Sequence, residues 1–125
     1  MRSRRPVSIP RRATRTEYNG VSYASKAEAA RARYLDERQR LGFIRGWIGQ
    51  PRFRLGCPEN VYVADFLVVT HEGLCVHVED VKGVETPKFR RDKKLWKKYG
   101  PCPLKIVRWK RNRWNVEVVE PETAT

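Results

Sequence analysis

The sequence lacks any long apolar run. No stretch approaches the roughly 18 consecutive apolar residues by which a membrane-spanning helix is recognised. No basic amphipathic helix is expected to expose a Trp and Phe face to a membrane surface, and the N-terminus has no apolar core of a secretory signal. We therefore expect a soluble, cytoplasmic protein that does not bind a membrane.

Cysteine and histidine are scarce. Cys57, Cys75 and Cys102 are odd in number and widely spaced, and only His71 and His77 accompany them. Such spacing predicts neither a disulfide framework nor a zinc site. We expect the cysteines to be reduced and structural.

Acidic residues are few beside basic ones. The 125 residues include 27 Lys and Arg against 14 Asp and Glu, which gives a formal net charge of +13. An excess of this size favours a polyanionic partner, and nucleic acid is the usual one. The length is that of a single domain with one core.

Composition divides the chain into three segments. Residues 1–16 contain six arginines, two prolines and no acid, which is typical of a disordered basic arm. The arm could serve solubility alone, but phosphate contact is favoured because no acid is present to pair with its arginines. We expect the folded domain to cover residues 17–119 and a flexible tail to cover residues 120–125.

Two stretches have the start and stop signals of helices. The first begins at the N-cap residue Ser25, is stopped by Gly42 and reads SKAEAARARYLDERQRLGF. The second begins at Pro87, which suits a first helical turn, and ends at Gly100. We expect the second helix to project its basic residues and to bury one apolar face, made of Phe89, Leu95, Trp96 and Tyr99.

Several short strands surround these helices. Asn19 with Gly20 is the strongest two-residue turn signal and predicts a hairpin across EYNGVSY. Strands are expected at residues 52–55, 61–69 and 74–82, and then in LKIVRW and RWNVEVV. The order helix, three strands, helix, two strands predicts an α/β fold of the α+β kind, with helices packed on one mixed sheet.

Acidic residues interrupt apolar strands at one place, between Val61 and Gly83. At a period of two, Asp65 and Asp80 each end an apolar stripe, where an isolated carboxylate is costly unless it is paired or bound to a metal. A hairpin that pairs these ends would bring both carboxylates and Lys82 into a small volume. Two such carboxylates repel unless a cation lies between them, and Mg²⁺ suits oxygen ligands of this kind. The pattern therefore predicts a magnesium site.

Asp65, followed by Asp80, Val81 and Lys82, resembles the D…(D/E)-x-K signature of the PD-(D/E)XK nuclease superfamily. The chain departs from this pattern at Ala64, where the superfamily's name has proline. It departs again at Asp80, where glutamate is commoner. Neither change removes a metal ligand.

A longer order of segments is similar to one group within this superfamily, the small phage-encoded proteins that resemble Holliday-junction resolvases. The similar segments lie within residues 18–109 and read YNGVSYASKAEA, QPRF, YVADF, VEDVKG and KFRRDKKLW. The resemblance implies a restriction-endonuclease-like fold with an αβββαβ core. It also implies a homodimer that acts on branched DNA in a bacterial host cell.

The resemblance implies a role for each site residue. Asp65 and Asp80 would ligate one or two Mg²⁺ ions, for which Mn²⁺ could substitute, without any small-molecule cofactor. Glu28 on the first helix would complete the metal cluster, and the carbonyl of Val81 would add a ligand. Lys82 would orient the attacking water or stabilise negative charge on the phosphorus. Asp65, Asp80, Lys82 and Glu28 are thus the expected catalytic residues.

Three polar residues have a structural alternative. A capping box at the start of the first helix would explain Glu28 without any chemistry. Gln50 precedes a proline, so it is more typical of a turn than of a site. Glu79 points to the opposite face of its strand, where it would pair with an arginine or with His77.

These observations favour a metal-dependent DNA endonuclease that hydrolyses phosphodiester bonds in branched DNA such as Holliday junctions. The alternatives are a nicking or restriction-like nuclease with another DNA target, and a non-catalytic basic nucleic-acid-binding protein. A pure binder has no need of Asp65 and Asp80, because acids oppose phosphate binding. The residues expected to contact DNA are basic and come from the arm, the second helix and the last turn: Arg11, Arg12, Arg15, Arg90, Arg91, Lys93, Lys94, Lys97, Lys98, Lys110, Arg111 and Arg113.

Overall fold

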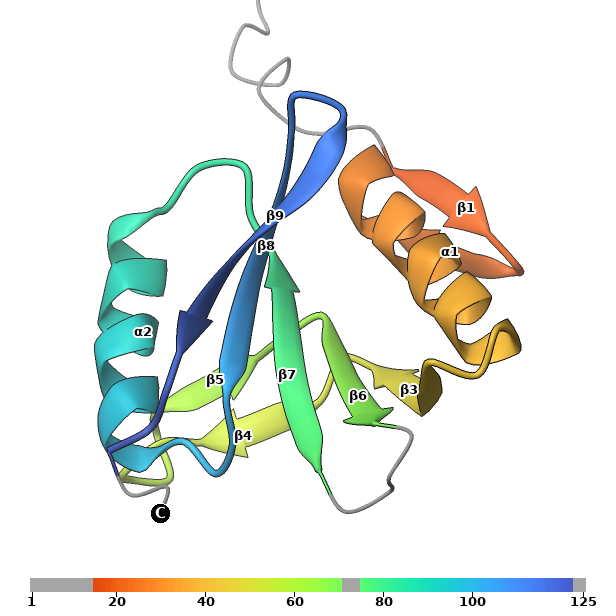
Figure 1. The fold of residues 1–125 in the computed structure, drawn as a ribbon. Helices are drawn as coiled ribbons and strands as arrows, with labels where there is room; N and C mark the ends of the chain where they lie inside the picture. Colours follow the sequence, from red (N-terminus) through yellow and green to blue (C-terminus); the bar gives the residue numbers. More distant parts are fainter. Residues whose placement is uncertain (1–14, 71–74, 123–125) are drawn as a thin grey trace, which may run out of the picture. The chain divides into compact units, whose positions relative to one another are not determined.

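The computed structural model describes residues 15–70 and 75–122, and these form an α+β fold (Figure 1). The chain divides into two compact units, residues 1–34 and 35–125, with the boundary inside the first helix. The elements are β1 (Thr16–Tyr18), β2 (Val21–Tyr23), α1 (Lys26–Arg40), β3 (Ile44–Gly49), β4 (Arg52–Arg54), β5 (Val61–Val63), β6 (Phe66–Thr70), β7 (Val76–Val81), α2 (Pro87–Tyr99), β8 (Leu104–Lys110) and β9 (Arg113–Val119).

The first unit contains the expected hairpin and the start of α1. β1 pairs with β2 in antiparallel fashion around a turn in which both Asn19 and Gly20 have positive φ. The hydroxyl of Ser25 accepts a hydrogen bond of 3.1 Å from the backbone N–H of Glu28, so the predicted N-cap is confirmed. Thr16 already belongs to β1, and the Arg15 guanidinium donates to Ser22, so the boundary expected after residue 16 comes too late.

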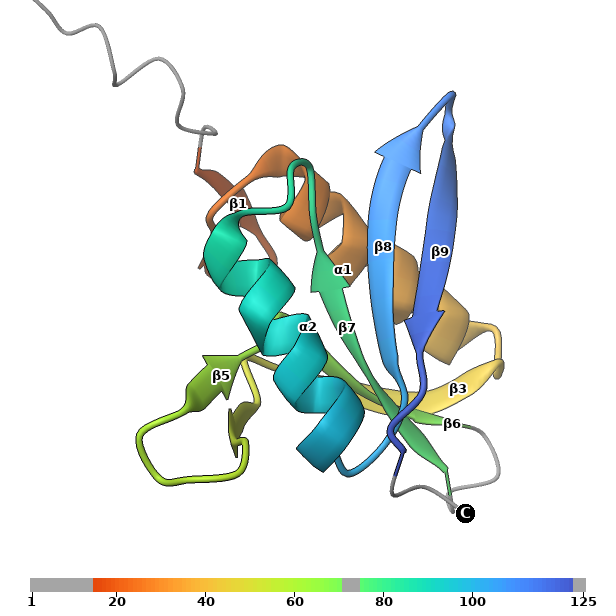
Figure 2. The same ribbon diagram turned by 90° about the vertical axis from the view of Figure 1, so that its left-hand side faces the viewer.

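The second unit is built on a five-stranded mixed sheet in the order β3-β6-β7-β8-β9. β7 and β8 are parallel, and the other neighbouring pairs are antiparallel. The parallel pair needs a crossover, and α2 supplies it (Figures 1 and 2). β4 and β5 form a separate two-stranded sheet.

One core lies between α2 and the strands beside it. Trp96 of α2 is fully buried, and its ring makes edge contacts with Phe53 and Tyr62. Its indole N–H donates to the carbonyl of Cys102 at 2.8 Å, which satisfies the one polar atom of the buried ring. The other members of this core are Leu55, Ala64, Val78, Phe89, Leu104, Ile106 and Val119.

The ends of α2 follow the sequence closely. Thr86 is the N-cap residue and its hydroxyl accepts from the N–H of Phe89, while Pro87 occupies the first turn. The helix ends before Gly100, where an added Cβ would lie 2.6 Å from the Trp96 ring, so only glycine fits. Tyr99 is 47% exposed, and its predicted place in the core is therefore wrong.

Three other expectations need correction. The expected strand 61–69 is broken at Ala64 and Asp65, because β5 pairs with β4 while β6 belongs to the main sheet. β3 was not expected, and it forms an edge of that sheet. The expected tail is partly held: Pro121 is buried and the N–H of Glu122 donates to the carbonyl of Lys97.

The three cysteines differ in their exposure to solvent. Cys57, Cys75 and Cys102 are all free thiols, but only Cys102 is buried, so a structural role fits that residue alone.

The turn between β6 and β7 lies outside the described residues. Among the elements that the structure describes, no helix has the length and apolar character needed to cross a membrane.

Candidate active site

Asp65 lies in the break between β5 and β6, beside the end of β7. Its backbone N–H donates to the carbonyl of Glu79 at 3.1 Å, one step beyond the pairing of Phe66 with Glu79. Its side-chain Oδ2 accepts a 2.7 Å hydrogen bond from the N–H of Val81. The Asp65 carboxylate is therefore held against the peptide bond that joins Asp80 to Val81.

Asp80 is almost completely buried, with 2% of its surface exposed. Its Oδ2 accepts a hydrogen bond from the hydroxyl of Tyr62 and lies 3.4 Å from the ammonium nitrogen of Lys82. A buried carboxylate needs such partners, because an isolated charge in this environment is costly. Asp80 thus has a donor from β5 and a cation from its own strand end.

Tyr62 holds its proton firmly. Burial raises the pKa of its phenol strongly, and the nearby charges of Asp80 and Asp65 raise it further. The phenol therefore acts as a fixed hydrogen-bond donor to Asp80 at any pH at which the protein works.

Lys82 lies at the border between the core and solvent. Its ammonium is 4.4 Å from the centre of the Phe89 ring, in cation–π contact, and 26% of its side chain is exposed. The structure therefore brings Asp65, Asp80 and Lys82 into one small region, as the sequence predicted. Lys82 is the member of this group that has both a buried partner and an open side.

Glu79 and Gln50 flank this group, and both have structural contacts. Glu79 is expected to pair with an arginine or with His77, and the structure shows the second of these contacts, with Nε2 of His77 2.8 Å from Oε2 of Glu79. Gln50 has a positive φ of 56° and its N–H donates to the carbonyl of Asp65 at 2.9 Å. Gln50 is thus a turn residue that also fixes the backbone of Asp65.

The two aspartates fit a hard divalent cation by their chemistry. Both offer carboxylate oxygens, which are the ligands that Mg²⁺ prefers, and the Val81 N–H that binds Asp65 directly follows Asp80 in the chain. Within residues 15–70 and 75–122, no three His, Cys, Asp or Glu side chains form a group that could hold a metal ion. The metal roles of Glu28, which lies in the other unit, and of the Val81 carbonyl stay predictions from the sequence.

Sequence reasoning missed Tyr62 as a member of this group. The available signal was its alternation with the apolar residues Ala64, Phe66 and Val68, all of which are buried. The apolar stripe expected to end at Asp65 is the other one, and it is not the buried face, since Val63 is 42% exposed. A tyrosine on a buried stripe needs a partner for its hydroxyl. Asp80 is that partner.

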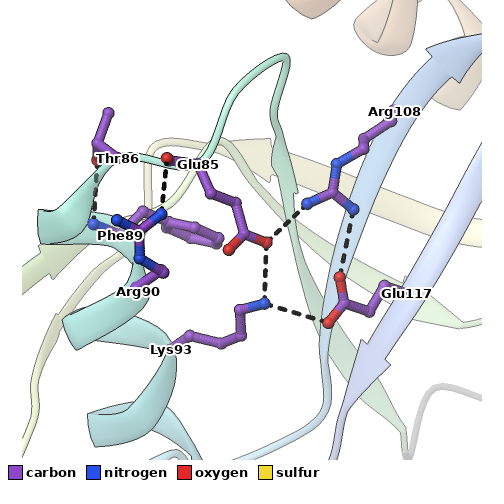
Figure 3. A network of polar contacts seen from close by, with 7 residues as sticks. All are labelled: Glu85, Thr86, Phe89, Arg90, Lys93, Arg108 and Glu117. Atoms are coloured by element: carbon purple, nitrogen blue, oxygen red, sulfur yellow. Dashed lines mark hydrogen bonds and ion pairs between the residues drawn. The ribbon is translucent and has the colours of Figure 1, made fainter.

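The basic residues expected on α2 are exposed, with one exception. Lys93 lies between two carboxylates, 2.8 Å from Glu85 and 3.2 Å from Glu117. Arg108 of β8 contacts the same two acids at 2.7 and 3.2 Å, so the four side chains close a ring (Figure 3). The expectation that Lys93 projects freely is therefore wrong. The residues of α2 that do project are Arg90, Arg91, Lys94, Lys97 and Lys98.

This ring of charges fixes the segment that leads from β7 into α2. The hydrogen bond from Lys93 lowers the pKa of Glu85, and Arg108 lowers it further. The carbonyl of Glu85 also accepts from Arg90, beside the Thr86 cap (Figure 3). Because Phe89 follows in the first turn of α2, the ring helps to hold the aromatic side chain against which Lys82 packs.

The remaining basic residues expected at DNA lie at other places. Lys110, Arg111 and Arg113 are exposed at the end of the β8–β9 hairpin, and Arg15 is exposed before β1. Arg11 and Arg12 lie outside the described residues.

A family model described as "Protein of unknown function (DUF1064)" matches residues 10–111. The chain belongs to this family. The matched range includes Asp65, Asp80, Lys82 and Tyr62. No curated protein and no solved structure matches the chain.

Proposed function

We propose that the chain is a metal-dependent endonuclease that hydrolyses phosphodiester bonds in DNA. The observation that carries this proposal is the placement of Asp65 and Asp80 at adjoining strand ends, with the Lys82 ammonium 3.4 Å from Asp80. In a chain of net charge +13, two acids at one point oppose phosphate binding, so they need another use. Holding a cation against a phosphate is such a use.

Each residue has a role that its environment supports. Asp65 and Asp80 would hold Mg²⁺. When bound, this ion would lower the pKa of a water ligand and offset charge on the phosphate oxygens. The Tyr62 hydroxyl donates to Oδ2 of Asp80, and the Val81 N–H donates to Oδ2 of Asp65. These two hydrogen bonds fix the orientation of the two carboxylates. Lys82, with its open side, would donate to a non-bridging phosphate oxygen as negative charge grows there.

The reaction is a hydrolysis, and its balance is simple. A water oxygen forms a bond to phosphorus, the bond from phosphorus to one ester oxygen breaks, and a proton passes from the water to solvent while the leaving oxygen gains one. No oxidant, reductant or second substrate is needed. The burial of Asp80 and Tyr62 keeps their hydrogen bond out of competition with water.

One part of the element order supports the resemblance with PD-(D/E)XK nucleases. β7 carries Asp80 in its last part and is followed by α2 and then by β8, which pairs with β7 in parallel. Three strands are expected between the two helices, at residues 52–55, 61–69 and 74–82, whereas the described residues form five strands there, from β3 to β7. We extend the proposal to branched DNA and to a homodimer on the strength of that resemblance.

The test is a cleavage assay on a labelled four-way junction, with matched duplex and single strands as controls. The purified full chain should cut in Mg²⁺ or Mn²⁺ and should be inactive in EDTA. Lys82→Met should cut more slowly, while metal affinity measured by calorimetry changes little. If no DNA form is cut in either metal, the nuclease proposal fails. Cleavage of duplex as fast as junction would refute only the proposal of branched DNA.

A second candidate is a non-catalytic basic protein that binds nucleic acid. It is favoured by one observation: Oδ2 of Asp80 already has two partners and the carboxylate is almost fully buried, as in a structural ion pair. In that case DNA would be bound but not cut. Asp80→Asn would then lower the free energy of unfolding without affecting any activity.

A further inference from the structure

The end of the β8–β9 hairpin carries two tryptophans and three cations in the sequence WKRNRW. Trp109 pairs with Trp114 across the strands, and Lys110 pairs with Arg113 at the next step. Because side chains alternate along a strand, the tryptophans lie on one face of the hairpin and Lys110 and Arg113 on the other. The end of the hairpin is therefore aromatic on one side and cationic on the other.

This end projects beyond the sheet. β8 pairs with β7 only as far as Val107, and from Arg108 onward its one strand partner is β9. Figures 1 and 2 show the two strands running on past the end of β7. The hairpin end can thus reach into a ligand that the sheet itself does not contact.

The turn places an arginine where the backbone does not favour one. Arg111 and Asn112 have φ values of 55° and 60°, which are typical of a two-residue turn with both central residues left-handed. Asparagine tolerates this conformation and glycine prefers it, but arginine does not. The Asn115 side chain steadies the turn by donating to the carbonyls of Lys110 and Arg113. A strained cation at an exposed tip suggests a use for its charge.

The aromatic side is open. The Trp109 and Trp114 rings meet edge to face, with centroids 5.1 Å apart, and 53% of Trp109 remains exposed. The contact with Trp114 accounts for part of Trp109 and leaves the rest of a large π surface in water. Bases stack on such surfaces in proteins that bind single strands.

The cationic side is also open. Within the part of the chain that the structure describes, Lys110, Arg111 and Arg113 make no ion pair. Together with Asn115 they line a hollow of about 510 Å³. Their charge is complementary to phosphate, and arginine suits phosphate geometry in particular.

We infer that the hairpin end binds single-stranded DNA that passes around its tip, with an unpaired base stacked on Trp109 on one face. Phosphates of the same strand would be held by Arg111 at the turn and by Lys110 and Arg113 on the other face. The inference deepens the proposed function, because unpaired bases occur where DNA strands diverge. It depends on the nuclease proposal only for the choice of DNA as ligand. DNA binding without cleavage would leave it standing.

The test measures binding by the full chain in EDTA, so that any cleavage is suppressed. The probes are a dT homopolymer, and a duplex with the same number of phosphates. Trp109→Leu should weaken dT binding roughly 5- to 150-fold, as expected for one lost stacking contact, and should change duplex binding much less. Arg111→Gly relieves the backbone strain of the turn, but it should weaken the binding of both ligands. It should also lower the slope of log affinity against log salt for the single strand by about 0.7.

Controls separate stacking from loss of structure. Val116→Ala changes a 49% exposed residue on the same face and should leave dT affinity unaltered. Trp109→Tyr keeps an aromatic ring and should retain most of the affinity, whether or not Trp109→Leu folds. In the wild type, dT should quench tryptophan fluorescence, and the quenching should fall in Trp109→Tyr.

Three results would overturn the inference. One is dT affinity within twofold of wild type in a folded Trp109→Leu. Another is an equal loss for dT and duplex, which would mark a general change of fold. The third is that Trp109→Leu changes the sedimentation of the free protein but does not change dT binding, which would assign this face to contact with a second copy of the chain.

Discussion

The hydroxyl of Tyr62, on β5, donates a hydrogen bond to the carboxylate of Asp80, in the last part of β7. The two residues are 18 positions apart, and both are at least 97% buried. Their contact joins the small β4–β5 sheet to the five-stranded sheet at the point where Asp65 also lies. The candidate site is therefore assembled where two sheets meet.

Tyr62→Phe removes this donor and leaves the ring in place. A hydrogen bond to a charged, buried group contributes about 1.5 to 3 kcal/mol, so the free energy of unfolding should fall by about that amount. Urea denaturation measures the loss. Tyr99→Phe is the control, because Tyr99 is 47% exposed, and it should change stability little. Equal values for the two variants would show that the Tyr62 hydroxyl does not support Asp80.

Glu85 should make stability depend on pH in the acid range. Its pKa is lowered in the folded state by Lys93 and Arg108, so its stabilising effect is complete above the ordinary glutamate pKa. The effect is lost as the pH falls through the lower, folded-state pKa. Unfolding by urea at several values from about pH 5 down to pH 3 should show this loss.

Glu85→Gln should flatten that part of the pH profile. Glu120→Gln is the matched control, since Glu120 is exposed and makes no ion pair with a described residue. A wild-type profile that keeps its full slope in Glu85→Gln would contradict the role given to the ring of charges.

Lys93 and Lys97 lie one turn apart on α2 and should separate stability from DNA binding. Lys93→Met breaks two ion pairs and should lower stability, whereas Lys97 is exposed and makes no ion pair with a described residue. Lys97→Met should lower the salt slope of duplex binding by about 0.9 if it contacts one phosphate. If Lys93→Met lowers the salt slope more than Lys97→Met does, the assignment of the exposed face of α2 to DNA binding is wrong.

Glu28→Gln tests the metal role that the sequence assigns to this residue. Glutamine also serves in a capping box, so the N-cap formed with Ser25 should persist and the melting temperature should be unchanged. A carboxylate ligand would be lost, so cleavage should fall at least tenfold. Full activity would show that Glu28 serves only in the helix cap.

Local signals allowed much of the fold to be predicted. The Asn19-Gly20 turn, the Ser25 cap and the limits of α2 each depend on a few neighbouring residues, and the structure bears them out. The juxtaposition of Asp65 and Asp80 was also accessible. It follows from the register of one hairpin, whose strands are close in sequence.

The parts that were missed depend on distant partners. The break at Ala64 and Asp65 interrupts a continuous apolar pattern, and only the pairing of β5 with β4 reveals it. β3 contains Gly46 and Gly49, which weaken a strand signal, and its strand conformation comes from pairing with β6. Positions 85, 93, 108 and 117 meet only because α2 crosses back onto β8 and β9, so no spacing in the sequence predicts their ring.

The central claim is that Asp65 and Asp80 hold the metal that cleaves DNA. The most direct test is single-turnover cleavage of a labelled four-way junction by Asp65→Asn and Asp80→Asn, with binding of the same DNA measured in parallel. Each variant should bind as tightly as wild type or more tightly, because a negative charge near phosphate is removed, while cleavage falls below detection. Unchanged cleavage by either folded variant would contradict the account.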